Sequence, residues 1–191
     1  MKRITFPAAC AAVLLAALTA SAELESFTVD PNHTYPAFEI GHFGYSIQRG
    51  RFNRTTGKVT LDAAANRGSA DIAIDTASVS TGHAKLEEHL RSEEFFNSAK
   101  YPLMTFKSSD FAFEGDKVRS AAGDLAINGV SRPVTLKAEY FNCAPHPMLK
   151  KKVCGAELTT TIKRSDFGIK AYLPVLADDV LLRINVEAIK D

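Results

Sequence analysis

Residues 81–106 contain the side chains of this sequence that are best suited to chemistry or ligand binding. His89 and Arg91 lie two positions apart in this segment. A guanidinium offers a planar fork of donors, and an imidazole titrates near neutral pH, so the pair could bind a phosphate or a carbonyl oxygen. Alternatively, Arg91 pairs with Glu88 or Glu94 and only orders the segment. The sequence alone allows both interpretations.

Other common sites of chemistry are absent from the sequence. It contains no Gly-x-Ser-x-Gly, Cys-x-x-Cys or His-Glu-x-x-His motif, no phosphate-binding loop and no Gly-x-Gly-x-x-Gly. His83 and His89 are six positions apart, so on one helix they project from different faces and make a poor metal pair. We therefore expect no catalytic residue, metal or cofactor. An enzyme acting on a ligand head group would have only His89 and Arg91 to rely on.

The first 22 residues have the features of a secretory signal peptide. Lys2 and Arg3 precede an apolar run at 8–18, and small residues occupy the cleavage positions that end at Ala22. The run is too short for a permanent membrane helix, which takes about 20 residues. We expect cleavage before Glu23 and a soluble exported protein.

The predicted mature chain, residues 23–191, is nearly neutral. Cleavage removes two of the 23 basic residues and none of the 22 acidic residues, which leaves a net charge of −1. This balance gives no basic footprint for nucleic acid, so no nucleic-acid partner is expected. The segment has the length of one domain and contains no repeat or linker that would divide it.

Two cysteines, Cys143 and Cys154, remain after cleavage. In an exported chain such a pair favours a disulfide over a metal or redox site. The residues between them, rich in proline and lysine, are typical of an exposed hairpin tip. We therefore predict a structural disulfide across this hairpin.

Alternation of apolar and polar residues predicts strands along most of the chain. It is clearest at 70–75, 158–163 and 180–188, and further strands are expected near 26–30, 36–41, 51–62, 103–113, 116–127 and 132–142. Short turns between them indicate an antiparallel meander. About eight such strands close into an up-and-down barrel, which removes exposed edges and holds side chains or one small ligand. The fold class is therefore all-β, an eight-stranded antiparallel barrel.

Two irregularities are expected in this barrel. Leu86 and Leu90 form an apolar stripe on a short helix at 82–91, which we expect to act as a lid over the barrel mouth. The apolar phase changes across 108–110, which predicts a bulge there, and Gly57 is expected to curve the strand at 51–62.

Five ordered blocks give the mature chain a resemblance to the YceI-like family. They are His42-Phe43-Gly44-Tyr45-Ser46; Arg49-Gly50-Arg51-Phe52; His89-Leu90-Arg91-Ser92 with Phe95-Phe96 and Tyr101-Pro102; Ile127-Asn128-Gly129-Val130 with Pro133-Val134-Thr135-Leu136; and Arg164-Ser165-Asp166-Phe167-Gly168. The resemblance implies a periplasmic, lipocalin-like barrel whose apolar cavity holds a polyisoprenoid chain, such as a polyprenyl phosphate or a quinone tail. The hairpin with Cys143 and Cys154 is similar to a subset for which a quinone is the plausible ligand.

A cavity of that kind suits the composition of this chain. Twelve Phe and no Trp supply apolar surface with few polar atoms. Burial is worth about 0.8 kcal/mol per methylene, so several isoprene units outweigh an ordering cost of about 4–15 kcal/mol. The alternative is a barrel filled by its own side chains. The predicted lining is Phe38, Phe43, Tyr45, Ile47, Phe52, Leu86, Leu90, Phe95, Phe96, Met104, Phe106 and Leu176, with Arg91 as a polar contact.

Three functional hypotheses follow. The first is a carrier that holds an isoprenoid lipid or quinone for transport, storage or protection, without permanent membrane insertion. The second is a secreted, stress-linked scavenger of assorted hydrophobic molecules. The third is an enzyme that acts on an isoprenoid head group. A homodimer is possible under each, although no apolar stripe in the sequence requires one.

Overall fold

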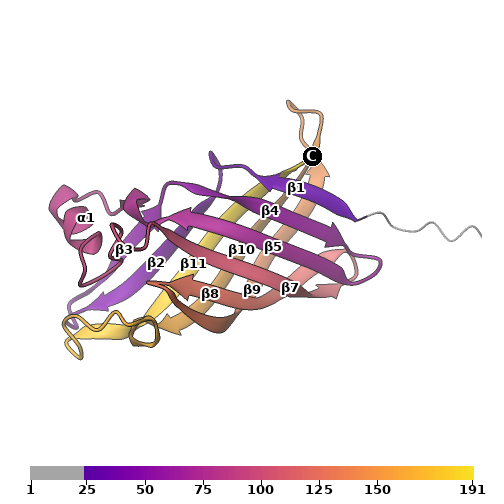
Figure 1. Cartoon of the computed structure of the whole chain (residues 1–191). Helices are drawn as coiled ribbons and strands as arrows, with labels where there is room; N and C mark the ends of the chain where they lie inside the picture. The colour runs from indigo at the N-terminus through magenta and orange to yellow at the C-terminus, as the bar shows by residue number, and fades with distance from the viewer. Residues whose placement is uncertain (1–23) are drawn as a thin grey trace, which may run out of the picture.

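The structure of residues 24–191, a computed structural model, is built almost entirely of strands (Figure 1). The predicted signal peptide, residues 1–22, lies outside the described residues. The elements are β1 (Glu25–Val29), β2 (Tyr35–His42), β3 (Ser46–Phe52), β4 (Thr55–Asp62), β5 (Arg67–Asp75), η1 (Thr76–Ser78), β6 (Val79–Ser80), α1 (Ala84–Leu90), β7 (Leu103–Glu114), β8 (Lys117–Ile127), β9 (Val130–Pro145), β10 (Lys152–Lys163), η2 (Arg164–Phe167) and β11 (Leu176–Lys190).

The strands close into an eight-stranded antiparallel barrel, as predicted. β1 and β2 lie one after the other along β11. In the same way, β3 and β4 are consecutive parts of one interrupted strand, and so are β5 and β6. Each of these pairs occupies one position of the barrel. β1 pairs with both β4 and β11 and so closes the ring.

The break between β3 and β4 differs from the sequence prediction of one strand over 51–62. The chain bends at Asn53 and Arg54, whose backbone amides donate to the carbonyl and hydroxyl oxygens of Ser78. Gly57 lies beyond the break and is needed for close packing, because a Cβ there would lie 2.4 Å from the carbonyl oxygen of Asp71. The bend is therefore set by bonds to η1 and not by the glycine.

The predicted bulge in β7 is confirmed. The register between β7 and β8 shifts between Ser108 and Asp110. The Ser108 hydroxyl donates to the carbonyl oxygen of Ala122 and accepts from the Asp110 amide, so the irregular backbone groups are satisfied. The bulge bends the strand where the barrel wall curves.

The predicted helix is confirmed but shorter than 82–91. Gly82 has a φ of 77° and His83 is extended, so α1 begins at Ala84. Nδ1 of His83 accepts from the Leu86 amide as the N-cap. The Glu87 carboxylate accepts from the amides of Thr81 and Gly82, and these bonds lower the pKa of Glu87. The polar residues of the segment thus fix the start of the helix.

The two ends of the barrel differ. Figure 1 shows α1 and the chain between η2 and β11 at one end, and the β9–β10 hairpin and the C-terminus at the other. At the hairpin end a buried apolar cluster fills the barrel; we call it the plug. Its buried members are Phe27, Leu61, Val118, Cys154 and Ala188.

The predicted disulfide joins Cys143 and Cys154, which are direct partners on β9 and β10. Cys154 belongs to the plug, and Cys143 packs against it. The bond therefore ties the protruding hairpin to the packed end of the barrel. Among residues 24–191 there is also no helix with the length and hydrophobicity needed to cross a bilayer.

Removing the disulfide is expected to lower stability without altering the lid end. Cys143→Ala/Cys154→Ala releases a loop with a sequence separation of 11 residues, so the free energy of unfolding should fall by about 3 kcal/mol or less. Urea unfolding of the oxidised protein and of the double variant measures the difference. Two reactive thiols in the unreduced wild type, or equal unfolding midpoints, would contradict the prediction.

Candidate functional site

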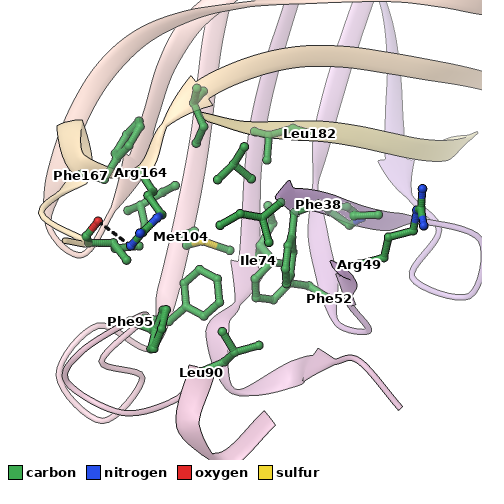
Figure 2. Close-up of a pocket in the computed structure, with 18 of the residues that line it drawn as sticks. Phe38, Arg49, Phe52, Ile74, Leu90, Phe95, Met104, Arg164, Phe167 and Leu182 are labelled. Atoms are coloured by element: carbon green, nitrogen blue, oxygen red, sulfur yellow. Dashed lines mark hydrogen bonds between the residues drawn. The ribbon is translucent and has the colours of Figure 1, made fainter. Parts of the chain in front are cut away.

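The half of the barrel that lies next to α1 contains a cavity of about 660 Å³ (Figure 2). Inward-facing apolar side chains of the strands form most of its wall, and Leu86 and Leu90 of α1 close part of its end. Small-molecule sites typically measure about 300–1,000 Å³. This half of the barrel is therefore not filled by its own side chains, in contrast to the plug.

The structure brings most of the predicted lining residues together. Ten of the twelve apolar residues border the cavity. They come from β2, β3, β7, β11, the turn after β2 and the lid segment, by which we mean α1 and the residues that follow it up to β7. These residues are Phe38, Phe43, Phe52, Leu86, Leu90, Phe95, Phe96, Met104, Phe106 and Leu176.

Tyr45 and Ile47 do not border the cavity and are exposed. The turn between β2 and β3 ends at Tyr45, and alternation along β3 then directs Gln48 and Phe52 toward the cavity. Because side chains alternate along a strand, Ile47 faces outward. Residues 43–47 therefore do not show which side chains of β3 face the cavity, because the turn interrupts the alternation between β2 and β3.

Three phenylalanines form an aromatic wall beneath the lid. The ring centroids of Phe52 and Phe96 are 5.2 Å apart, and Phe38 lies 6.1 Å from Phe52 and 6.3 Å from Phe96. Figure 2 shows Phe38 and Phe52 beside one another at the cavity. Gly50 permits this, because a Cβ at that position would lie 2.4 Å from the Phe38 ring.

The lid segment is fixed to the barrel at several points. Nδ2 of Asn128, in the turn after β8, donates to the carbonyl oxygen of Phe95 (2.6 Å). The Phe95 ring stacks on Tyr172, with centroids 6.3 Å apart. The Phe96 amide donates to the carbonyl oxygen of Leu90. The segment after α1 thus connects the turn after β8 with the chain that precedes β11.

The polar pair of the lid, His89 and Arg91, makes different contacts from the pairing of Arg91 that the sequence suggested. His89 borders the cavity, and its Nε2 lies 2.7 Å from the carboxylate of Glu94. Within the described residues, Arg91 makes no ion pair with Glu88 or Glu94 and is not among the residues that border the cavity. Its backbone amide ends α1 by donating to carbonyl oxygens of the last turn. His89, and not Arg91, makes the side-chain contact with Glu94.

A buried arginine was not singled out from the sequence, although it lies in the fifth block. The Arg164 guanidinium borders the cavity and donates to three carbonyl oxygens, those of Ala177 (2.8 Å), Ile169 (3.2 Å) and Leu176 (3.1 Å). Burial lowers the pKa of Arg164, and Asp178 partly opposes this. The cation therefore holds the chain between η2 and β11 in place; one of its bonds is drawn in Figure 2.

Some polar groups of the cavity lie where it meets solvent. Gln48 and His83 border the cavity and are exposed, as is Phe43. Arg49 also borders the cavity, but its guanidinium is directed to Glu39, 3.4 Å away. The cavity therefore reaches the surface between the β2–β3 turn and the lid; we call this opening the mouth. Chemically, the arrangement suits a molecule with a long apolar part and a polar end.

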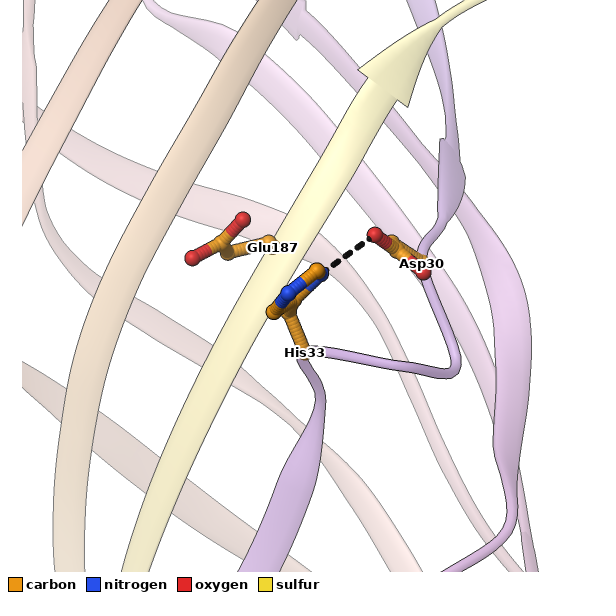
Figure 3. Close-up of side chains that lie close together, drawn as sticks. All are labelled: Asp30, His33 and Glu187. Atoms are coloured by element: carbon orange, nitrogen blue, oxygen red, sulfur yellow. Dashed lines mark hydrogen bonds and ion pairs between the residues drawn. The ribbon is translucent and has the colours of Figure 1, made fainter.

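A cluster of titratable groups lies outside the cavity, where β1 passes into β2 (Figure 3). Ligand atoms of Asp30, His33 and Glu187 lie within 4.8 Å of one another. Nδ1 of His33 is 2.8 Å from the Asp30 carboxylate, and this bond is the main reason why the pKa of His33 is raised. This distance is that of a hydrogen bond within the connection between β1 and β2, and the contact becomes an ion pair when His33 is protonated.

Comparison with known proteins agrees with the geometry. The family model described as YceI-like domain matches residues 27–188. Protein YceI of Escherichia coli O157:H7 is 36% identical over 193 residues, which cover 100% of this chain and 99% of that protein.

Solved structures share the barrel. The YCEI protein of Campylobacter jejuni matches with a TM-score of 0.70 and 32% identity over 80% of this chain and 90% of that one. A domain of Saccharophagus degradans, described as a polyisoprenoid binding domain, matches with a TM-score of 0.66 over 88% of this chain and 100% of its own. Its identity of 16% shows the likeness of fold alone.

The ion pair at the β1–β2 break predicts an upward shift of one histidine pKa. We expect His33 to titrate above its ordinary value of 6.5, and Asp30→Asn to bring it back toward that value. Glu187→Gln should have a smaller effect, because Glu187 is the weakest of the causes. Proton NMR titration measures all three proteins.

The sign of the stability effect follows from the same shift. A raised pKa in the folded state stabilises the protein fully below the unfolded pKa, and the contribution is lost as pH rises through the folded value. The stability difference between wild type and His33→Gln should therefore shrink in that range. A wild-type His33 that titrates at or below 6.5 would overturn the assignment.

Proposed function

This chain belongs to the YceI-like domain family, and on that premise we propose that it is a periplasmic binding protein for a long isoprenoid lipid. The ligand would be a polyprenyl phosphate or a prenylated quinone, held for transport, storage or protection. The observation that carries the proposal is the cavity of about 660 Å³ with its apolar wall. Description of a neighbour with the same fold as a polyisoprenoid binding domain supports it.

The energetics favour recognition of the chain over the head group. Each buried methylene contributes about 0.8 kcal/mol, and the wall offers aliphatic and aromatic contacts throughout. The ten predicted residues that border the cavity are the proposed contacts. Affinity should therefore rise with chain length until the cavity is full.

The head group is proposed to lie at the mouth. Gln48 and His83 are exposed there, and a polar group placed beside them keeps contact with water. A head group placed at the inner end would lie against the apolar side chains of the plug and lose its hydration. The isoprenoid tail therefore points inward.

Export to the periplasm is part of the proposal. It is supported by the signal-like pattern of residues 1–22 and by the disulfide between Cys143 and Cys154. Disulfides persist in oxidising compartments, of which the bacterial periplasm is one.

The direct experiment is native mass spectrometry of the protein expressed with its own leader, followed by solvent extraction. We expect a stoichiometric prenyl quinone or polyprenyl phosphate. If no prenyl lipid is recovered and the purified protein binds neither undecaprenyl phosphate nor a decaprenyl quinone, the proposal is wrong. Equal affinity for unrelated apolar dyes would instead favour the scavenger, and turnover of a bound ligand would favour the enzyme.

Neighbouring residues of β11 provide a matched pair of variants. Leu182 borders the cavity, whereas Leu181 does not. Leu182→Trp fills part of the cavity and should weaken binding of a decaprenyl quinone by about tenfold or more, equivalent to about two displaced methylenes. Leu181→Trp should bind as the wild type does.

Ligand titration by intrinsic fluorescence quenching and thermal unfolding are measured for both variants. Retained folding with equal affinity for the two proteins would show that the chain does not occupy this cavity. Loss of binding in Leu181→Trp alone would have the same meaning.

A further inference from the structure

Three side chains that the proposed function does not use meet on the outer wall of the barrel (Figure 3). Asp30 and His33 belong to the connection between β1 and β2, and Glu187 belongs to β11. Their ligand atoms lie within 4.8 Å of one another. Among residues 24–191, no other group of three His, Cys, Asp or Glu side chains meets in this way. We call these three residues the outer cluster.

The outer cluster is separate from the cavity. Val186 borders the cavity and Ala188 belongs to the plug, so both face inward. Because side chains alternate along a strand, Glu187 between them faces outward. Asp30 and His33 do not border the cavity either. A role of the outer cluster therefore does not depend on the ligand that we propose for the interior.

Backbone hydrogen bonds hold the three residues of the outer cluster in place. The Asp30 amide donates to the carbonyl oxygen of Glu187 (2.8 Å). The Thr34 hydroxyl donates to the same carbonyl oxygen and accepts from the Glu187 amide, at 3.2 Å in each case. Thr34 is buried, which shields these bonds from water. The connection between β1 and β2 is thus fixed against β11.

The two carboxylates of the outer cluster differ in their contacts. One oxygen of Asp30 accepts from the Asn32 amide, and the other lies 2.8 Å from Nδ1 of His33. Within the part of the chain that the structure describes, the Glu187 carboxylate has neither a hydrogen bond nor an ion pair. Its partner across the sheet is Gly155, where even an added Cβ would lie 3.8 Å from the Glu187 side chain. The contact between Asp30 and His33 therefore accounts for two members of the cluster and leaves the third with room to turn.

Together these groups match the preferences of a divalent transition-metal ion. One imidazole nitrogen and two carboxylate oxygens suit borderline ions such as Zn²⁺, whereas Mg²⁺ and Ca²⁺ favour sites made of oxygen alone. Two carboxylates and a neutral imidazole carry two negative charges, which balance a dication. Ligand atoms lie about 2.0–2.2 Å from Zn²⁺, so rotation of the Glu187 side chain has to close part of the 4.8 Å span.

We propose that Asp30, His33 and Glu187 bind a divalent transition-metal ion on the outer wall of the barrel. Pairing of β1 with β11 creates the site, because it brings Glu187 beside residues from the start of the described chain. The spacing of histidines along the chain therefore does not reveal it. An ion held there joins the β1–β2 connection to β11, and its binding stabilises the folded state.

The test uses untagged, oxidised protein from which metal has been removed with EDTA. Zn²⁺ is titrated by isothermal calorimetry at about pH 8, where imidazoles are mostly neutral. The site variants are His33→Gln and Glu187→Gln. The matched control is Glu94→Gln, which removes the carboxylate that lies 2.7 Å from Nε2 of His89. That contact also joins a histidine to a glutamate, but among the described side chains no third ligand group completes it.

We expect the wild type and Glu94→Gln to bind one Zn²⁺ with equal affinity. Each site variant should bind at least about tenfold more weakly, because it loses one ligand. Zn²⁺ should also raise the thermal unfolding midpoint of the wild type more than that of Glu187→Gln. Wild-type protein that binds no Zn²⁺, or a Glu187→Gln variant with wild-type affinity, would overturn the proposal. Loss of affinity in Glu94→Gln instead would place the ion at His89 and have the same meaning.

Proton NMR of the histidine rings locates the ion independently. The His33 ring signals are identified by their absence in His33→Gln, and Zn²⁺ should shift or broaden them before those of the other histidines. Circular dichroism and the metal-free unfolding midpoint show whether Glu187→Gln is folded, which we expect because the backbone bonds of residue 187 remain. His33 signals that do not change when the calorimetric site is saturated would contradict the proposal.

Discussion

Pairing of the short strand β1 with both β4 and β11 is the interaction on which the barrel depends. It joins the first described strand to the last and gives each a partner on its open edge. Polar contacts reinforce it: Glu25 lies within ion-pair distance of Lys152 and Lys190, and the Asp191 carboxylate accepts from Lys58, Ser26 and Thr28. Without this closure the sheet would have two free edges and no interior to enclose.

The closed barrel is divided into a packed half and a hollow half. The plug around Phe27 packs the hairpin end, where the disulfide also lies. The aromatic wall of Phe38, Phe52 and Phe96 borders the hollow half and supports the lid. The larger buried cluster surrounds the cavity, and the smaller one forms the plug. A cavity is thus maintained inside a wall of packed side chains, although close packing of a protein interior normally removes such space.

Sequence patterns predicted the features that repeat and missed those that depend on contacts between distant segments. Alternation along β11 and β10 predicted strands, and the phase change at 108–110 predicted the bulge, because each signal is local. The outward position of Ile47 depends on where a turn ends. The role of Arg164 depends on carbonyl groups up to 13 residues away, which no periodicity reveals.

The plug also limits how a ligand could enter and leave the barrel. Phe27, Leu61 and Val118 are packed together at the hairpin end, so a ligand held as we propose, with its tail inward, would enter and leave through the same opening. Its head group would then be the last part to enter and the first to leave, and an acceptor would meet the head group before the tail.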